Sequence, residues 1–320
     1  MSQVAQRRPR AAADAPESAS GCLPLAAPEP SGHVRELVLP EPGQEFVPCR
    51  STRPGGCAQA VEGDLERIGR AAAGLVPARQ SAARYAESRV RFRWRLGHHA
   101  AIAVWRASAR QLRALADAGD ASAPSDDHER AAELIDLYSL LLLYAGSCTP
   151  DEYAATVRAD MAGHHPAFSG AWARDREPVA DLQGRVCRRH PESPLATAAR
   201  TNRAVHAAVA ARLVPSGGSL LRKSGHHPSD RPTVADYELH DSFFGVRRAA
   251  VCERSFAAQS IRRLAQVACD IAVHGLDGPG VPPLRFADPR TADRLTSDPC
   301  ALISRVAAVL APTEHGGRHD

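Results

Sequence analysis

Apolar residues recur at intervals of three, four or seven along most of the chain after residue 60, which is the spacing of amphipathic helices. The longest such run extends from Ala83 to Asp117, and a second extends from Ser125 or Asp126 to about Tyr144. Along the first run the inward-facing positions are Val90, Trp94, His98, Ile102, Trp105, Leu112 and Leu115. No stretch alternates apolar and polar residues for long enough to form a sheet. The pattern therefore predicts an all-α fold.

Helix-start signals place further helices in the second half of the chain. Thr149 is followed by Pro-Asp-Glu, and this combination of a capping residue, a first-turn proline and two acids predicts a helix that runs to about Met161. Ser193-Pro194 predicts the start of another helix, which ends before the Pro-Ser-Gly-Gly-Ser sequence of residues 215–219.

The remaining segments follow from the same pattern. Helices are expected over residues 234–274, with a break at Gly245, and over residues 290–311. Residues 162–192 and 216–233 have the composition of loops.

The two ends of the chain differ from the middle. Residues 1–60 are rich in Pro, Gly, Ser and Ala and lack periodicity, which predicts a disordered or loosely packed arm. Within the arm, His33–Leu39 is the candidate for a short strand or a hook onto the main body. Residues 61–312 are predicted to form a single all-helical domain, and residues 313–320 a flexible tail.

Composition narrows the range of functions. The 320 residues are 44% hydrophobic, which is enough for one large core or two modest ones. The net charge of +4 is spread along the chain outside Arg7-Arg8-Pro9-Arg10, so no nucleic-acid partner is expected. No apolar run approaches the length of a membrane span, so no membrane partner is expected. Eight cysteines without a C-x-x-C pair, and no secretory leader, favour free thiols in a reducing cytoplasm.

His206 stands out in the helix that begins at Ser193-Pro194. Four alanines around it, at positions 207, 208, 210 and 211, leave the helix surface nearly flat. Such a surface can receive another helix closely, in which case His206 is an ordinary buried histidine. It can equally receive a planar macrocycle whose iron the imidazole binds. The residues alone leave both interpretations open.

Two histidine pairs are further candidates. His98 shares the apolar face of its helix and His99 lies nearer the flank, and either can be an ordinary helix–helix contact. His164-His165 lies in a predicted loop, close to Phe168 and Trp172. Zinc and hydrolase sites are not indicated, because the sequence has no H-E-x-x-H motif, no Cys/His cluster and no G-x-S-x-G motif.

Two segments together resemble the tryptophan 2,3-dioxygenase-like superfamily of haem-dependent aromatic oxygenases. The helix with His98-His99 ahead of Trp105 resembles the distal helix of that superfamily. His206, followed by the Ser216–Ser219 loop, resembles its proximal, haem-ligating helix. Within the superfamily, the sequences DLYSLLLLYAGSCTP (136–150) and HPAFSG (165–170) are similar to the bacterial haem-dependent L-tyrosine 3-hydroxylases of secondary metabolism. The resemblance covers about residues 80–275.

The resemblance implies a tryptophan-2,3-dioxygenase-like helical bundle that encloses a haem, with His206 as the proximal ligand of the iron. One type of family member has a histidine about forty positions earlier and a cysteine four positions after the ligand, bonded to the haem. Here His165 is the candidate second axial ligand, and Ala210 stands in the place of the cysteine. A non-covalent haem b is therefore expected.

The implied distal residue is His98 or His99. A gap-free match to the distal tryptophan favours His99, whereas the aromatic four positions earlier and the apolar face favour His98, which we prefer. The expected reaction converts L-tyrosine to 3,4-dihydroxy-L-phenylalanine (dopa) with hydrogen peroxide, or with dioxygen and a reductant, in antibiotic or other secondary metabolism. The distal imidazole would move a proton between the two oxygens of the peroxide.

The same resemblance suggests substrate contacts. Arg158 is the counterpart of a carboxylate-binding arginine, and Trp94 and Phe168 are expected to pack against the substrate ring. Backbone donors are expected from Ser216, Gly217, Gly218 and Ser219. A solvated Arg158 and ordinary core packing of the two aromatic residues are the alternatives.

Two rival functions stay open. One is a sister haem oxygenase that acts on tryptophan, an indole or a substituted tyrosine. The other is a cofactor-free helical binding or regulatory protein. Members of the superfamily often associate, which leaves a homodimer open.

Overall fold

The computed structural model describes residues 34–49, 56–75, 86–118, 125–225, 230–278, 280–286, 293 and 295–311. Helices dominate this part of the chain, and the expected all-α class is confirmed. The longer helices are α1 (Gly56–Ala72), α2 (Ala86–Asp117), α3 (Ser125–Ala145), α6 (Arg176–Arg189), α7 (Pro194–Leu213), α9 (Val234–Phe244), α10 (Glu253–His274) and α12 (Pro299–Leu310). The shorter ones are α4 (Pro150–Tyr153), the π-helical turn η2 (Ala154–Arg158), α5 (Ala159–His164), the 3-10 turn η3 (Gly170–Trp172) and α8 (Leu220–Lys223). A tryptophan-2,3-dioxygenase-like arrangement of these helices stays a prediction.

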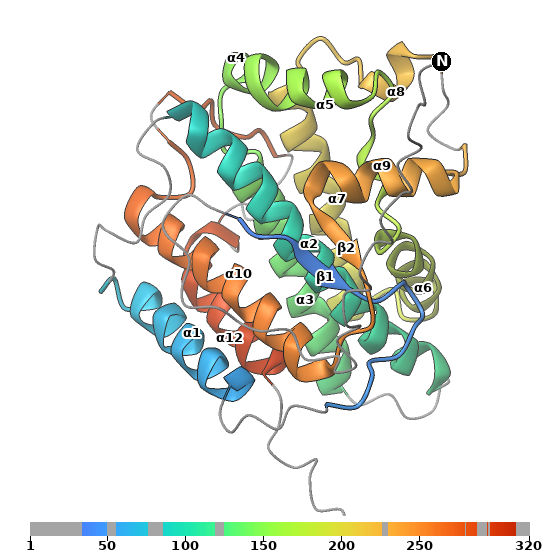
Figure 1. Cartoon of the computed structure of the whole chain (residues 1–320), viewed down its shortest axis with the longest axis vertical. Coiled ribbons are helices and arrows are strands. Elements are labelled where there is room, and N and C mark those ends of the chain that lie inside the picture. Colours follow the sequence, from blue (N-terminus) through green and yellow to red (C-terminus); the bar gives the residue numbers. More distant parts are fainter. Residues whose placement is uncertain are drawn as a thin grey trace, which may run out of the picture.

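Helix α2 runs through the middle of the molecule (Figure 1) and packs against α3, α6 and α10. Its residues Leu96, Val104 and Leu112 are fully buried. Because each interval of eight residues rotates the position by about 80° around the helix axis, these residues show that α2 is covered on more than one side. Helix α7 packs along α3, while α1 and α12 pack against α10. The two long helices α2 and α3 therefore join the part of the molecule that contains α7 to the part that contains α10.

Two three-residue strands lie against this helical body. β1 (Leu37–Leu39) pairs in parallel with β2 (Val246–Arg248). Gln259 of α10 accepts a hydrogen bond from the Val38 amide (2.9 Å) and donates one to the Val38 carbonyl (3.0 Å). Because Leu37 and Leu39 are 0% exposed, this strand is part of the core.

The structure thus changes the expectation for residues 1–60. The candidate strand within His33–Leu39 is present at Leu37–Leu39 and is buried, whereas most described residues on either side of it are exposed or only partly buried. Helix α1 begins at Gly56, five residues before the predicted start of the helical domain. Residues 1–33 and 50–55 of the arm, and the predicted tail 313–320, lie outside the described residues.

The helix-start signals are confirmed in detail. The Thr149 side chain accepts a hydrogen bond from the Glu152 amide (3.2 Å), and the Glu152 carboxylate accepts one from the Thr149 amide (2.9 Å), which makes a capping box. The Ser193 side chain caps α7 at the Ala196 amide (3.2 Å). Helix α9 ends at Gly245, whose φ of +68° is the left-handed conformation that glycine adopts readily. The predicted break at Gly245 is therefore confirmed.

Two of the expected loops contain helices, and in residues 216–233 this is the short helix α8 (Leu220–Lys223). Residues 162–192 were expected to form a long loop, but they contain α6, which runs over Arg176–Arg189. Its buried positions are only Val179, Leu182 and Val186, and charged side chains occupy most of the rest. Such a narrow apolar stripe gives a weak helical signal, and packing against α2 completes the helix.

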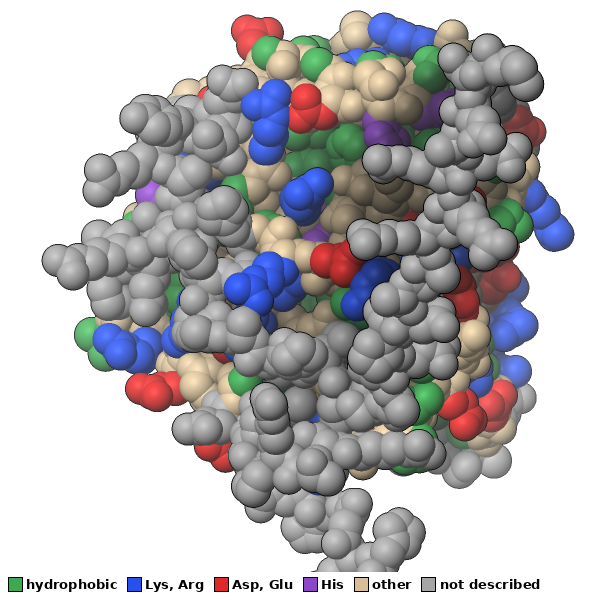
Figure 2. All heavy atoms as spheres, viewed as in Figure 1, with side chains coloured by type: hydrophobic (Ala, Val, Ile, Leu, Met, Phe, Trp, Pro, Cys, Tyr) green, Lys and Arg blue, Asp and Glu red, His purple; other side chains and the backbone are tan. Residues whose placement is uncertain are grey.

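The surface charge and the length of the apolar helices are the last features of the fold. Figure 2 shows acidic and basic side chains interspersed over the face that carries α2, α5 and α9. Among the described residues, no single helix is long and apolar enough to cross a membrane. The bent pair Asp126–Ala145 and Pro150–His164 is long and apolar enough only when its two helices are taken together.

Candidate active site

A cavity of about 390 Å³ lies between α2, α3, α7 and α9, and the segment from η2 to α6 closes it. This volume falls within the range of roughly 300–1,000 Å³ that is typical of small-molecule and cofactor sites. Most of the wall is apolar or aromatic. Its larger aromatic residues are Trp94, Trp105, Tyr138, Tyr153 and Phe168, and its imidazoles belong to His98, His206 and His240.

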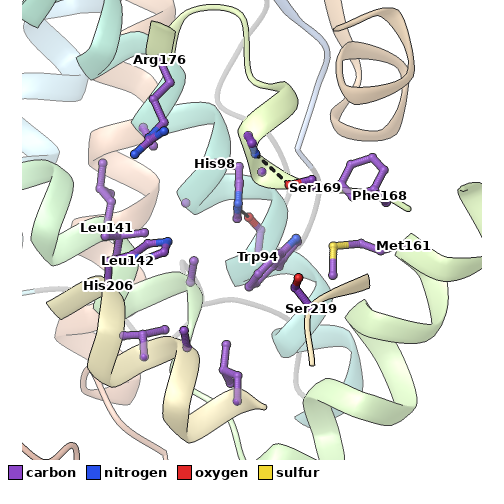
Figure 3. A pocket seen from close by; sticks show the side chains of 18 of the residues that line it. Trp94, His98, Leu141, Leu142, Met161, Phe168, Ser169, Arg176, His206 and Ser219 are labelled. Carbon is purple, nitrogen blue, oxygen red and sulfur yellow. Dashed lines mark hydrogen bonds between the residues drawn. The ribbon is translucent and has the colours of Figure 1, made fainter. Parts of the chain in front are cut away.

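His206 projects from α7 into this cavity. In Figure 3 its ring extends from the helix toward the space in front of His98. Ala207, Ala210 and Ala211 are exposed, so no helix of the described chain covers the flat alanine surface around it. The His206 side chain is exposed toward the open cavity. Desolvation by the cavity wall, and then the positive charge of Arg176, lower its pKa below the ordinary value. The imidazole is therefore neutral near pH 7 and keeps a lone pair.

The adjacent histidines of α2 face different surroundings. His98 lines the cavity, whereas His99 is 0% exposed and is not among the lining residues. The His99 Nε2–H donates to the Phe244 carbonyl at the end of α9 (2.5 Å). Burial, with a contribution from Arg263, lowers the pKa of His99 to about 3. The structure thus brings His98 toward His206 and uses His99 to join α2 to α9.

The tautomer of His98 follows from its one hydrogen bond. Its Nδ1 lies 2.7 Å from the Trp94 carbonyl, which can only accept, so Nδ1 carries the proton. Nε2 of the neutral ring is then an acceptor. The ring is held between Trp94 and Phe244, with centroid distances of 4.5 and 4.3 Å. Burial lowers the pKa of His98 to about 4, so the imidazole is a neutral proton acceptor near pH 7.

Arg158 reaches the cavity from the π-helical turn η2. π-helical turns inside helices are frequent at functional sites, because the extra residue changes the direction of the side chains. The Arg158 guanidinium donates to the Gly218 carbonyl (2.7 Å) and to the Tyr153 hydroxyl. Arg158 is therefore not a solvated side chain. Its guanidinium places a positive charge at the cavity wall and has further N–H groups that can donate to a ligand.

The glycine-serine loop after α7 contributes less than expected. Ser219 lines the cavity and caps α8, since its side chain accepts from the Arg222 amide (3.2 Å). Gly218 offers its carbonyl to Arg158, while Ser216 and Gly217 are exposed and do not line the cavity. Gly217 has a φ of +78°, a left-handed conformation that glycine adopts readily, so the chain does not continue as an α-helix here.

Four further predicted site residues have clear positions. Trp94 and Phe168 both line the cavity, and Ala210 lies on its α7 side. His165 is not among the lining residues. Its Nδ1 accepts from the Ala167 amide (3.2 Å), and its ring packs against Trp172 at 5.2 Å. The structure therefore places His165 outside the cavity wall and not beside His206.

Sequence reasoning missed the polar lining residues Ser169, Arg176 and His240, of which Arg176 and His240 bear on the chemistry of the cavity. Arg176 is the first residue of the missed helix α6, donates to the Tyr138 hydroxyl and points toward the His206 side of the cavity in Figure 3. His240 is 1% exposed on α9. No spacing in the sequence marks either residue, although His240 stands just before Phe243-Phe244 in an aromatic segment.

Ligands for a bare metal ion are not grouped in the described residues. No set of three His, Cys, Asp or Glu side chains there is placed to hold a metal ion. None of the six described free cysteines, Cys49, Cys148, Cys187, Cys252, Cys269 and Cys300, lines the cavity. The groups that face the cavity and can bind a metal are single imidazoles, each from a different helix.

Fold and cavity together define a helical protein with a mostly apolar ligand site, into which imidazoles project from three helices and guanidinium groups from two segments. Residues 56–182 match the family model of SfmD 3-methyl-L-tyrosine peroxygenase. The match covers less than half of the chain and supports a tyrosine peroxygenase-like family and an oxidoreductase activity. His98, Arg158, Phe168 and Arg176 lie within the matched residues, whereas His206 and His240 lie beyond them. A search of curated proteins finds no match to the chain.

Proposed function

We propose that the protein is a haem-dependent peroxygenase that hydroxylates L-tyrosine or a ring-substituted L-tyrosine, within the tryptophan 2,3-dioxygenase-like superfamily. One observation carries the proposal. Two neutral imidazoles, His206 on α7 and His98 on α2, project into the same apolar cavity, and one of them stands on a helix surface made flat by alanines. The family match of residues 56–182 supports the same reaction class.

The donor set fits a haem better than a metal ion held by side chains alone. A protein-bound metal usually needs three or four side-chain ligands, whereas a haem iron needs one axial imidazole because the porphyrin supplies the rest. His206 offers that imidazole, and Arg176, which lies on the same side, suits a propionate. Ala210 lines the cavity where a thioether would need a cysteine, which supports a non-covalent haem b.

The chain's own residues supply substrate positioning and proton transfer. When bound, a histidine-ligated haem supplies peroxide activation with less electron donation than a thiolate ligand gives. His98 is placed to accept a proton at Nε2 and return it, which assists O–O cleavage. The aromatic wall excludes water from the reacting ring, and Arg158 is placed to hold the substrate carboxylate. The net reaction, L-tyrosine + H₂O₂ → dopa + H₂O, balances without a further reductant.

Two substrates are consistent with this site. Our expectation for L-tyrosine comes from the sequence, and the matched family model is described for 3-methyl-L-tyrosine, which favours the substituted-tyrosine alternative over tryptophan or an indole. Both tyrosines place a phenol on an amino acid, so the same residues would hold them. A direct competition among L-tyrosine, 3-methyl-L-tyrosine and L-tryptophan with hydrogen peroxide, followed by product analysis, decides among them. The peroxygenase proposal also places the enzyme in secondary metabolism, where such hydroxylated tyrosines are made.

The absorption spectrum tests the proposal directly. The purified protein should show a Soret band that is lost in His206→Gly and restored by added imidazole, because the vacated position on α7 opens into the cavity. His165→Ala serves as the matched control and should keep the band, since His165 does not line the cavity. A colourless protein after haem reconstitution would contradict the proposal and favour the cofactor-free alternative.

A second experiment separates the two distal candidates. His98→Ala should keep the Soret band but lose most of its peroxide-dependent turnover, because the cavity-facing proton acceptor is gone. His99→Ala should mainly lower stability, because the Phe244 carbonyl loses its buried donor. Equal turnover in the two variants would rule out the assignment of His98.

A further inference from the structure

His240 is a buried imidazole on the cavity wall with no hydrogen-bond partner among the described residues. It is 1% exposed, and neither ring nitrogen is paired. Buried polar groups of native proteins are almost always paired, because an unpaired donor or acceptor lowers stability. An unpaired imidazole at a ligand cavity therefore points to a polar group on the ligand.

The surroundings of His240 are aromatic. Its ring stacks on Phe168 with an interplanar angle of 8° and a centroid distance of 6.0 Å, and it contacts Phe244 at 4.8 Å. Phe244 also stacks on His98 at 4.3 Å, so one ring contacts two of the three cavity imidazoles. Burial, followed by the charges of His98 and Arg248, lowers the pKa of His240 to about 3. Near pH 7 His240 is thus neutral, with one donor and one acceptor.

Two contacts just after His240 hold this end of α9 in place. The adjacent Asp241 accepts two hydrogen bonds from Arg248, each 2.8 Å long, and Arg248 also reaches Asp175 at 2.6 Å. At the last residue of the helix, the Phe244 carbonyl accepts from His99 of α2. A side chain on a helix end that is fixed in this way is suited to orienting a ligand group, because little freedom is lost on binding.

We propose that His240 binds the phenolic hydroxyl of the substrate and orients the ring in the cavity. This assignment rests on the proposed function. The phenol O–H donates to the unprotonated ring nitrogen of His240, while the amino-acid carboxylate goes to Arg158. A neutral imidazole has one donor and one acceptor, and a hydroxyl has a donor and an acceptor to match them. Because the imidazole is uncharged, it suits the neutral phenol better than an anionic group. His240 is therefore a specificity-determining residue that selects a hydroxylated ring over an unsubstituted one.

The test compares binding of L-tyrosine with binding of L-phenylalanine, which differs only by the hydroxyl. Isothermal titration calorimetry is done on the haem-loaded protein without peroxide, so that no turnover occurs. The wild-type protein should bind tyrosine about tenfold or more tightly than phenylalanine, the size of effect expected for one buried hydrogen bond. In His240→Phe, tyrosine affinity should fall to that of phenylalanine, whose own affinity stays within about threefold. His164→Phe is the matched control and should keep the preference, because His164 contacts Phe168 and Phe243 but is exposed and lies outside the cavity.

Stability separates binding from a structural role. His240→Phe removes two unpaired nitrogen atoms from an aromatic cluster, so its melting temperature without substrate should be equal to or above that of the wild type. If this variant does not fold, His240→Leu serves for the same comparison. A folded variant that keeps the tyrosine preference overturns the assignment of His240 and leaves the haem proposal intact. Wild-type protein that binds neither amino acid, or binds both equally, overturns the assignment together with the proposed phenolic substrate. Loss of the Soret band in His206→Gly tests the haem site independently of both.

Discussion

Gly146 is the position where a single methyl group should move the helix that carries His206. It follows α3, and a Cβ placed on it would lie 2.6 Å from Cγ1 of Val209 on α7. Val209 is one turn after His206, and Arg212 of the same helix donates to the Gly146 carbonyl (2.7 Å). Gly146→Ala therefore pushes α7 away from α3 at the level of the candidate ligand.

The size of the effect follows from this distance. Carbon atoms in contact lie about 3.5–4.0 Å apart, so the two atoms must separate by roughly 1 Å. Val209 cannot easily turn its Cγ1 away, because a β-branched side chain in a helix has one strongly preferred rotamer. Overpacking of this kind costs about 1–3 kcal/mol, whereas replacing Gly by Ala contributes at most about 1 kcal/mol through the unfolded chain. We expect a net loss of about 1–2 kcal/mol in the free energy of unfolding.

Urea denaturation followed by circular dichroism measures this loss in a double-mutant cycle. Val209→Ala removes the atom that collides, so the double variant should be more stable than the sum of the single effects by about 1 kcal/mol or more. Gly69→Ala in α1 is the matched control and should be neutral or slightly stabilising, because a Cβ there meets nothing within 4 Å. Wild-type stability of Gly146→Ala, or strictly additive effects, would refute the reasoning. Haem affinity should fall in Gly146→Ala and recover in the double variant.

Three further predictions concern the cavity. Ala210→Cys places a thiol one turn after His206 on the cavity wall, so part of the haem should stay bound to the chain after acid–acetone extraction, and none should in Ala207→Cys, whose side chain does not line the cavity. Arg158→Gln should raise the KM for L-tyrosine about tenfold or more without changing that for tyramine, which lacks the carboxylate; equal changes for both would show that Arg158 acts through the fold. His99 and His240 have pKa values lowered to about 3, so between pH 6.5 and 3 the unfolded chain binds protons that the folded chain does not. The free energy of unfolding should therefore fall as the pH falls, by about 1.4 kcal/mol per pH unit for each histidine, and urea midpoints at pH 6 and pH 5 should show a shallower fall in His240→Phe than in the wild type.

The long helices could be predicted because their signals are local. Periodicity over many turns gave α2 and α3, and the capping residues Thr149 and Ser193 gave the starts of α4 and α7. Helix α6 failed the same test, since its three buried positions are separated by charged residues and its packing partner α2 lies far away in the sequence. Strand β1 was recognisable only as a candidate, because its partner β2 is more than two hundred residues later.

The candidate site was predictable where one helix face decides it. His98 was preferred because it shares the apolar face of α2, and His206 was put forward by its alanine neighbours together with the family resemblance; the structure turns both toward the cavity. His240 could not be found in this way, because its position depends on α9 docking against α2 through the His99–Phe244 hydrogen bond. The loop of residues 216–219 was overestimated for a related reason. Composition indicates a turn, but the direction of its backbone depends on contacts such as that between Gly218 and Arg158.

The cavity is built from two parts of the chain that the family match separates. The matched residues 56–182 supply the wall with His98 and Arg158, while the later residues supply His206 and His240. The register between these parts is set by a few contacts, including the close approach of Gly146 to Val209 and the hydrogen bond from Asn202 of α7 to Ser139 of α3 (2.9 Å). Both contacts join α7 to α3 or to the residue that follows it, so they fix the position of the helix that carries His206. In the proposed function, the proton acceptor His98 and the phenol-binding His240 therefore come from different parts of the chain, and only the first of these parts matches the family model.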